Sequence, residues 1–180
     1  CRRVVVCVPA SLVGNWGAEF KKWLGAERVD PQLVEGGDKQ ARELFQNWAL
    51  PSQRRRSVLI TSYETLRAHA DALARASVDL LICDEAHRLK NATNATKGAV
   101  ALTMLNCTRR VLLTGTPIQN DLDEFFAVMD FACPGLMGDL TSFRKIYAAP
   151  IGKAGERGAS EEEKRIGAAR RAELGRLTQG

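Results

Sequence analysis

Two neighbouring carboxylates, Asp84 and Glu85, directly follow the aliphatic run Leu80–Cys83, and His87 comes two positions later. Such a run predicts a buried strand, which would place both carboxylates at the end of the strand. Bare carboxylates side by side repel each other, and a divalent cation removes that repulsion. In enzymes that transfer phosphoryl groups, one strand-end acid holds Mg²⁺ on the nucleotide and a neighbouring acid orients the attacking water. The alternative is a surface Asp-Glu pair that caps the following helix.

Polar residues also end three other aliphatic runs. The stretch "RRVLLTGTPIQN" passes through Thr-Gly-Thr to Gln119 and Asn120, while "VVVCVPASLVGNW" and "VLITSYETL" end in Pro, Ser, Thr or Tyr before a helical pattern. Hydroxyl groups and helix N-terminal amides at such places suit phosphate oxygens. Taken singly, the Thr-Gly-Thr-Pro stretch is more typical of an ordinary turn and the other two stretches of a helix cap, so the prediction depends on their occurring together.

The elements that position these residues alternate along the chain. Aliphatic or β-branched runs predict strands over 4–8, 58–63, 79–83 and 110–115, with a weaker strand over 28–35. Apolar residues at three- and four-residue steps predict helices over 12–24, 38–48, 64–74, 93–105 and 121–131. This alternation predicts an α/β fold, a three-layer lobe with a mostly parallel central sheet flanked by helices. In such a sheet, ligands bind beyond the carboxyl ends of the strands.

Composition narrows the class of protein. The chain has 180 residues, 45% of them hydrophobic, which suffices for one sizeable core. Its net charge of +5 suits a polyanionic partner without requiring one. Five scattered cysteines without a Cys-x-x-Cys pattern indicate reduced thiols in an intracellular protein. No apolar run approaches the roughly 18 residues of a membrane span, so we expect no membrane contact.

The C-terminal segment has a different composition. Residues 150–160 are rich in Gly, Ala and charge, which predicts a linker. Ser160 followed by Glu163 fits a capping box and predicts a charged helix to about Leu177. We therefore expect one domain over 1–149 and a linker with a charged helix over 150–180. The three tryptophans, Trp16, Trp23 and Trp48, are expected to be packing anchors, and His69 a solvated helix residue.

Four stretches together resemble the Swi/Snf-type translocases of helicase superfamily two. "ICDEAHRLKN" is similar to the second motif of that family, "LLTGTPIQN" to its third, "VVVCVPASLVGNWGAEFKKW" to Ia and "VLITSYETL" to Ib. The segment "SFRKIYAAPIGKAGERGASEEEKRIGAARRAELGRL" resembles the homologous-recombination repair branch, the Rad-fifty-four-like translocases. The resemblance covers Val4 to Leu177.

The resemblance implies the N-terminal RecA-like lobe of an ATP-dependent double-stranded-DNA translocase. It would be a nuclear ATPase that uses ATP and Mg²⁺, with a strand-exchange recombinase, chromatin and a second RecA-like lobe of the same chain as partners. Asp84 would coordinate Mg²⁺ through the nucleotide, Glu85 would position the water, and His87 and Gln119 would couple the nucleotide to the lobe interface. Gly115 and Thr116 would lie by the nucleotide, and together with Thr114 they would communicate hydrolysis to the residues that grip DNA. The residues expected near DNA are Pro9, Ser11, Leu12, Asn15, Thr61, Ser62, Tyr63, Lys90 and Asn91.

Two departures from the family pattern leave alternatives open. The chain contains no Gly-Lys-Ser or Gly-Lys-Thr, the phosphate-cradling pattern, and no arginine finger of a second lobe. Because the phosphate loop precedes the Ia strand in that family, the resemblance implies that it lies upstream of Cys1, and we expect these 180 residues alone to be inactive. The alternatives are a non-catalytic scaffold that has lost nucleotide binding and an RNA helicase of the DEAH type.

Overall fold

The computed structural model describes residues 3–25, 27–50, 57–73, 76–87, 105, 107–115 and 121–178. The chain divides into two compact units, residues 1–117 and 118–180. Each unit has its own buried core, and each is described by itself below.

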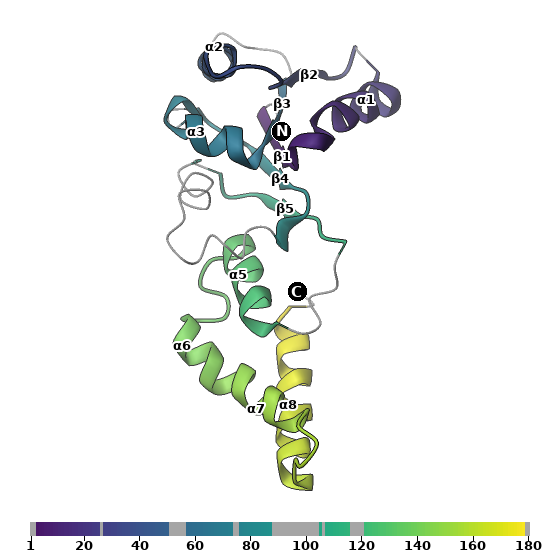
Figure 1. Ribbon diagram of the computed structural model, residues 1–180, viewed down its shortest axis with the longest axis vertical. Helices are drawn as coiled ribbons and strands as arrows, with labels where there is room; N and C mark the ends of the chain where they lie inside the picture. The colour runs from purple at the N-terminus through teal and green to yellow at the C-terminus, as the bar shows by residue number, and fades with distance from the viewer. Residues whose placement is uncertain are drawn as a thin grey trace. The chain divides into compact units, whose positions relative to one another are not determined.

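The first unit is built on a five-stranded sheet (Figure 1). Its strands are β1 (Arg3–Val8), β2 (Asp30–Leu33), β3 (Ser57–Ser62), β4 (Leu80–Cys83) and β5 (Arg110–Leu112). The order is β2-β3-β1-β4-β5, and every neighbouring pair is parallel. Cys7 on β1 lies opposite both Thr61 on β3 and Cys83 on β4. The five predicted strands and the parallel sheet are confirmed.

Helices cover both faces of this sheet (Figure 1). They are α1 (Val13–Leu24), which a 3₁₀ turn (Ala10–Leu12) precedes, α2 (Asp38–Ala49) and α3 (Tyr63–Leu73). Val6, Val8 and Ile60 face α1 and form a buried cluster with Val13, against which Trp16 packs. The alternate residues, such as Val5, Leu59 and Leu81, are also fully buried, so β1, β3 and β4 are apolar on both faces, as expected of inner parallel strands.

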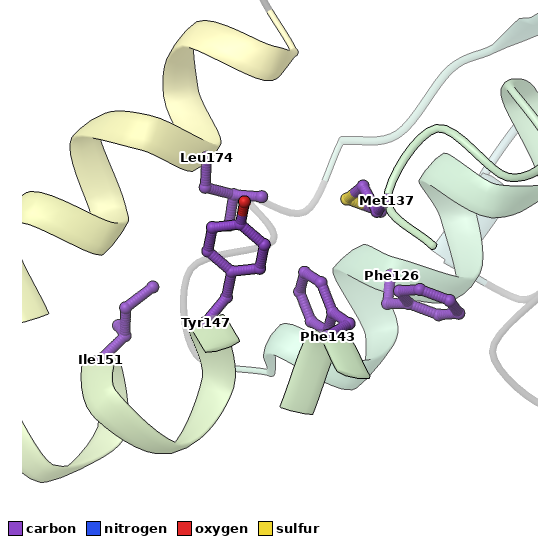
Figure 2. Packing of buried hydrophobic residues seen from close by; sticks show 6 residues of the cluster. All are labelled: Phe126, Met137, Phe143, Tyr147, Ile151 and Leu174. Atoms are coloured by element: carbon purple, nitrogen blue, oxygen red, sulfur yellow. The ribbon is translucent and has the colours of Figure 1, made fainter. Parts of the chain in front are cut away.

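The second unit is helical. It comprises α5 (Leu122–Ala132), α6 (Leu140–Phe143), a π-helical turn (Arg144–Ala148), α7 (Ala149–Ala154) and α8 (Glu161–Leu177). Figure 2 shows its core, in which the Phe143 ring is fully buried 5.0 Å from the Phe126 ring and 5.6 Å from the Tyr147 ring. The remaining members of the cluster are Met137, Ile151 and Leu174. The helix predicted over 121–131 is α5, and Asp121 caps it by accepting hydrogen bonds from the amides of Asp123 and Glu124.

The C-terminal segment only partly follows its predicted structure. The capping box at Ser160 and the helix to Leu177 are confirmed. The linker predicted over 150–160 is wrong in its first half, because α7 runs from Ala149 to Ala154 and buries Ile151 in the core of the second unit. The domain boundary after residue 149 stays a prediction, and the helix predicted over 93–105 falls mainly on residues that the structure does not describe.

Two predictions from composition concern the described residues. No described helix has the length and apolar character needed to cross a membrane. Cys7, Cys83, Cys107 and Cys133 are free thiols, the first three buried, as expected of cysteines used as small apolar residues.

Candidate functional site

The site lies at the carboxyl edge of the sheet. Because β1, β3, β4 and β5 are parallel, the residues that follow them meet at one edge. Pro9 follows β1, Tyr63 follows β3, Asp84 follows β4, and Thr114 lies just beyond β5. The structure therefore brings together the ends of the four stretches that the sequence singled out.

Asp84 is held by hydrogen bonds from three directions. Its amide donates to the carbonyl oxygen of Cys7 at 2.9 Å, which continues the pairing of β4 with β1. Its own carbonyl oxygen accepts the Tyr63 hydroxyl at 2.7 Å. Its carboxylate accepts the Trp16 indole N–H on Oδ2 and the Glu85 amide on Oδ1, both at 2.9 Å. The position and the orientation of this carboxylate are both determined by its neighbours.

Glu85 adopts a backbone conformation that an L-residue rarely takes. Its φ is 51°, the one positive value among the non-glycine residues that the structure describes. A glutamate in this left-handed region is strained, and such strain concentrates at functional sites. The turn directs its carboxylate towards His87, whose Nδ1 lies 3.2 Å from Glu85 Oε2.

A polar chain continues from His87 to the end of β5. His87 Nδ1 lies 3.5 Å from Thr114 Oγ1, so Glu85, His87 and Thr114 form a line from β4 to β5. The next residue after Thr114 is Gly115. A Cβ there would lie 3.9 Å from Glu85 Oε1, an ordinary contact, so the described neighbours leave room for a side chain.

An open pocket of about 600 Å³ lies beside these residues. It is lined by Pro9, Ala10 and Ser11 after β1, by Glu64 at the start of α3, and by Glu85 and His87 after β4. Both side chains of the Glu85–His87 pair are about one third exposed, so they can reach a ligand in the pocket and are not simply solvated. A capping role for the acidic pair alone does not account for this convergence.

Tyr63 contacts the site through its hydroxyl, which donates to the backbone carbonyl oxygen of Asp84. Burial strongly raises the pKa of its phenol above the ordinary value, and the nearby thiol of Cys83 adds to that effect. Burial also raises the pKa of the Cys83 thiol to about 12. Both groups are therefore neutral at physiological pH, and their role at the site is that of hydrogen-bonding partners rather than nucleophiles.

The residues expected near DNA differ in their accessibility. Ser11 and Asn15 are exposed, whereas Pro9 and Leu12 are half-buried. Thr61 and Ser62 are buried, with 0% and 4% of their surface exposed. Ser62 Oγ accepts the Thr65 amide at 3.0 Å and caps α3, which is the capping role that the sequence left open. A direct contact from Thr61 or Ser62 to DNA stays a prediction that this burial does not favour.

The remaining predicted residues are Lys90, Asn91, Thr116 and Gln119, which lie outside the described residues. Within the described part of the chain, no three His, Cys, Asp or Glu side chains cluster as a dedicated metal cage. A pair of carboxylates without such a cage fits Mg²⁺, which proteins commonly bind through one or two carboxylates together with phosphates and water.

Sequence reasoning missed three features. Trp16 was expected to be a packing anchor, and it packs on the core but also donates to Asp84. Glu64 lines the pocket, and its place two residues after the end of β3 was the available signal. His69, expected to be solvated, is 6% exposed and its Nε2 lies 2.9 Å from Asp38 Oδ1. The expectation for Trp23 was also wrong, because 72% of its surface is exposed, while Trp48 is buried as expected.

Comparisons with known proteins agree with this arrangement. The human DNA repair and recombination protein RAD54B is 49% identical over 98% of this chain, and the Schizosaccharomyces pombe DNA repair protein rhp54 is 43% identical over 97%. The chain spans 18% and 21% of the length of these two relatives. Among solved structures, the Sulfolobus solfataricus SWI2/SNF2 ATPase core in complex with dsDNA matches 93% of this chain and 32% of its own, with 28% identity and a TM-score of 0.66.

The sheet and its flanking helices are thus those of a SWI2/SNF2 core of the RecA-like type. A family profile described as the SNF2-related domain matches residues 2–174, nearly the whole chain. This chain belongs to the SNF2-related domain family.

Proposed function

We propose that this chain is part of the first RecA-like lobe of an ATP-dependent double-stranded-DNA translocase that acts in homologous-recombination repair in the nucleus. The observation that carries the proposal is the convergence of Asp84, Glu85 and His87 at the carboxyl edge of the sheet, beside the pocket. Two findings support double-stranded DNA as the polymer. The relatives are named as DNA repair and recombination proteins, and the structural neighbour was solved in complex with dsDNA.

Asp84 would hold the magnesium ion of Mg-ATP with the lone pairs that its two hydrogen bonds leave free. When bound, the ion would supply positive charge that offsets the charge developing during phosphoryl transfer. Glu85 would accept a hydrogen bond from the attacking water and orient it in line with the γ-phosphate. Its strained backbone supports this role, because it turns the carboxylate out of the sheet and towards the pocket.

His87 would hold Glu85 in place and link it to Thr114, and Gln119 would extend the same link towards the second lobe. Gly115 and Thr116 would lie beside the nucleotide. Ser11 and Asn15, both exposed after β1, would contact the DNA backbone together with Pro9, Leu12, Lys90 and Asn91. Contacts of this kind are made mainly to phosphate, so binding would depend steeply on salt and weakly on sequence.

The test uses the full-length protein, because the chain contains no Gly-Lys-Ser or Gly-Lys-Thr to cradle the phosphates. ATP hydrolysis is measured with duplex DNA, single-stranded DNA and RNA. We expect duplex DNA to stimulate hydrolysis most. Stimulation by RNA without a response to duplex DNA would favour an RNA helicase, and absence of nucleotide binding would favour a scaffold. We also expect the 180 residues alone not to hydrolyse ATP.

Glu85→Gln tests the assigned residue. Loss of a positioned acid–base group costs on the order of 10² to 10⁴ in rate, so turnover should fall by that factor while ATP binding persists. Glu43→Gln, the same change at an exposed position on α2, is the matched control and should hydrolyse ATP at the normal rate. Normal turnover in Glu85→Gln would refute the assignment.

A further inference from the structure

The Asp84 carboxylate accepts a hydrogen bond from the side chain of Trp16, a residue 68 positions away in sequence. The indole lies on α1, in its first turns after β1, and its N–H donates across to Oδ2 at 2.9 Å. The other oxygen, Oδ1, accepts the Glu85 amide at the same distance. Two donors on two different oxygens fix the rotation of the carboxylate. An ionised carboxylate has about four lone-pair sites, so about two stay available to a cation.

The ring of Trp16 is itself held in place. It is half-buried and packs against the cluster of Val6, Val8 and Ile60, and the Phe20 ring lies 6.0 Å away on the next turn of α1. A rigid bicyclic donor anchored on the sheet cannot follow the carboxylate if that group rotates. It therefore imposes an orientation on Asp84, which a flexible lysine or glutamine would not do.

A second indole on the same helix shows what a purely local bond looks like. Trp23 Nε1 donates to Glu19 Oε2, four residues earlier, and the ring is 72% exposed. That bond joins two side chains on the surface of one helix. The bond from Trp16 joins α1 to the residue that ends β4, 68 positions away in sequence.

We propose that Trp16 is a positioning residue that holds the Asp84 carboxylate in the orientation required to bind the nucleotide's divalent cation. This inference rests on the function proposed above, since it concerns the same carboxylate. Residues that orient a metal ligand commonly contribute 10- to 100-fold to metal affinity or activity. The proposal gives Trp16 a role in addition to core packing, and the two roles are separable because packing needs the ring whereas positioning needs the N–H.

The test is a binding measurement on the full-length protein. Mn²⁺, which prefers the same oxygen ligands as Mg²⁺, is titrated in the presence of saturating ADP, and free Mn²⁺ is followed by electron paramagnetic resonance. Trp16→Phe should weaken Mn²⁺ binding by about 10-fold or more, as expected for loss of an orienting partner. Trp23→Phe, which also removes an indole N–H bonded to a carboxylate, should stay within about twofold because exposed pairs contribute little.

A coupled variant separates positioning from packing. If Trp16 acts through Asp84, then Trp16→Phe should weaken Mn²⁺ binding no further in an Asp84→Asn background. Should Trp16→Phe lower the melting temperature, replacement of Trp16 by β-(benzothienyl)alanine keeps the bicyclic ring and removes only the donor. The same loss of Mn²⁺ affinity in that protein would support the proposal.

The outcomes are distinguishable. Unchanged Mn²⁺ affinity in the benzothienyl protein, with normal binding in the unmodified protein, would overturn the role of Trp16 and leave the proposed function intact. Equal losses of affinity from Trp16→Phe with and without the Asp84→Asn change would also overturn it. Failure of the unmodified protein to bind Mn²⁺ with ADP would overturn the proposed function and this inference together.

Discussion

The hydroxyl of Tyr63, the first residue of α3, donates a hydrogen bond to the backbone carbonyl oxygen of Asp84, 2.7 Å away. That carbonyl lies just beyond β4. The Asp84 amide makes the last hydrogen bond between this segment and β1, so the carbonyl is past the end of the β1–β4 pairing. The phenol thus satisfies a half-buried backbone group at the point where the chain leaves the sheet. Together with Trp16 it fixes Asp84 from two helices that follow different strands.

Tyr63→Phe should destabilise the first unit. The ring stays, but the Asp84 carbonyl loses its partner, and a hydrogen bond of this kind contributes about 1 kcal/mol to the free energy of unfolding. Denaturant unfolding of both proteins, followed by circular dichroism, measures the difference. Equal midpoints at neutral pH would show that water replaces the hydroxyl without cost.

The same variant should lose part of the alkaline sensitivity of the fold. Burial raises the pKa of Tyr63 above its ordinary value of 10.0, so the unfolded chain releases this proton at lower pH than the folded chain. The contribution of Tyr63 to stability is therefore complete below pH 10.0 and is lost as the pH rises above it. The stability difference between the unmodified protein and Tyr63→Phe should shrink above that pH. A difference that stays constant as the pH rises through that value would contradict a raised pKa at Tyr63.

Glu85 is predicted to trade stability for activity. Its φ of 51° costs free energy for a glutamate, and asparagine tolerates the same conformation better. Glu85→Asn should therefore raise the free energy of unfolding by about 0.5 to 1 kcal/mol while it abolishes hydrolysis. Glu85→Gln keeps the backbone preference of glutamate and should lose activity without that gain. Chemical denaturation of the two variants in parallel checks the comparison, and equal stability would argue against strain at Glu85.

The fold was predictable because local pattern and tertiary structure agree along the sheet. Runs such as Val4–Val8 and Leu80–Cys83 are apolar on consecutive residues, which is typical of strands buried on both faces. Once the strands were parallel, the edge at which Asp84 and Glu85 lie followed from topology. Asp84 and Glu85 could therefore be placed at this edge of the sheet without any knowledge of side-chain contacts.

Contacts between distant segments were not predictable in the same way. The bond from Trp16 to Asp84 depends on how α1 rotates on the sheet, and the apolar spacing of α1 marks a packing face without showing where an indole N–H points. His69 likewise was assigned to solvent because a single helix does not reveal that Phe45 and Asp38 of α2 cover it. The helix α7 was missed because Gly152 and Gly155 gave its segment the composition of a loop.

Gly167 is predicted to be indispensable to the contact between α7 and α8. A Cβ at this buried position would lie 2.3 Å from the Ala154 Cβ and 3.0 Å from the carbonyl oxygen of Pro150. Gly167→Ala should therefore push the helices apart and cost about 1 to 3 kcal/mol, the usual range for overpacking. Thermal and denaturant unfolding measure the loss.

A matched glycine in the same helix provides the control. A Cβ at Gly175 would meet nothing within 4 Å, so Gly175→Ala should stabilise α8 by up to about 1 kcal/mol through helix propensity alone. Opposite signs for the two variants are the expected result. Ala154→Gly should partly restore the stability of Gly167→Ala, since it removes the nearer of the two contacts. Stabilisation by Gly167→Ala would contradict the close approach of the helices.

The stability of the N-terminus of α8 is predicted to fall at acid pH, because its capping box uses the carboxylate of Glu163. The Ser160 amide donates to Glu163 Oε2 at 2.8 Å, and this bond, with that from the Ser160 hydroxyl, lowers the pKa of Glu163 below its ordinary value of 4.5. Because the folded pKa is the lower one, Glu163 contributes stability above pH 4.5, and the contribution is lost as the pH falls through the lowered pKa.

Glu163→Gln should therefore destabilise α8 at neutral pH, and its difference from the unmodified protein should disappear at acid pH. Glu162→Gln removes a charge from the same helical turn but no capping bond, since Glu162 pairs with Arg165 at 2.8 Å instead. It controls for the general effect of an acidic first turn on the helix dipole. Amide hydrogen exchange in the first turn of α8, measured from neutral to acid pH, reports the fraying directly. A pH dependence equal in the two variants would mean that the dipole, and not the capping box, holds this end of the helix.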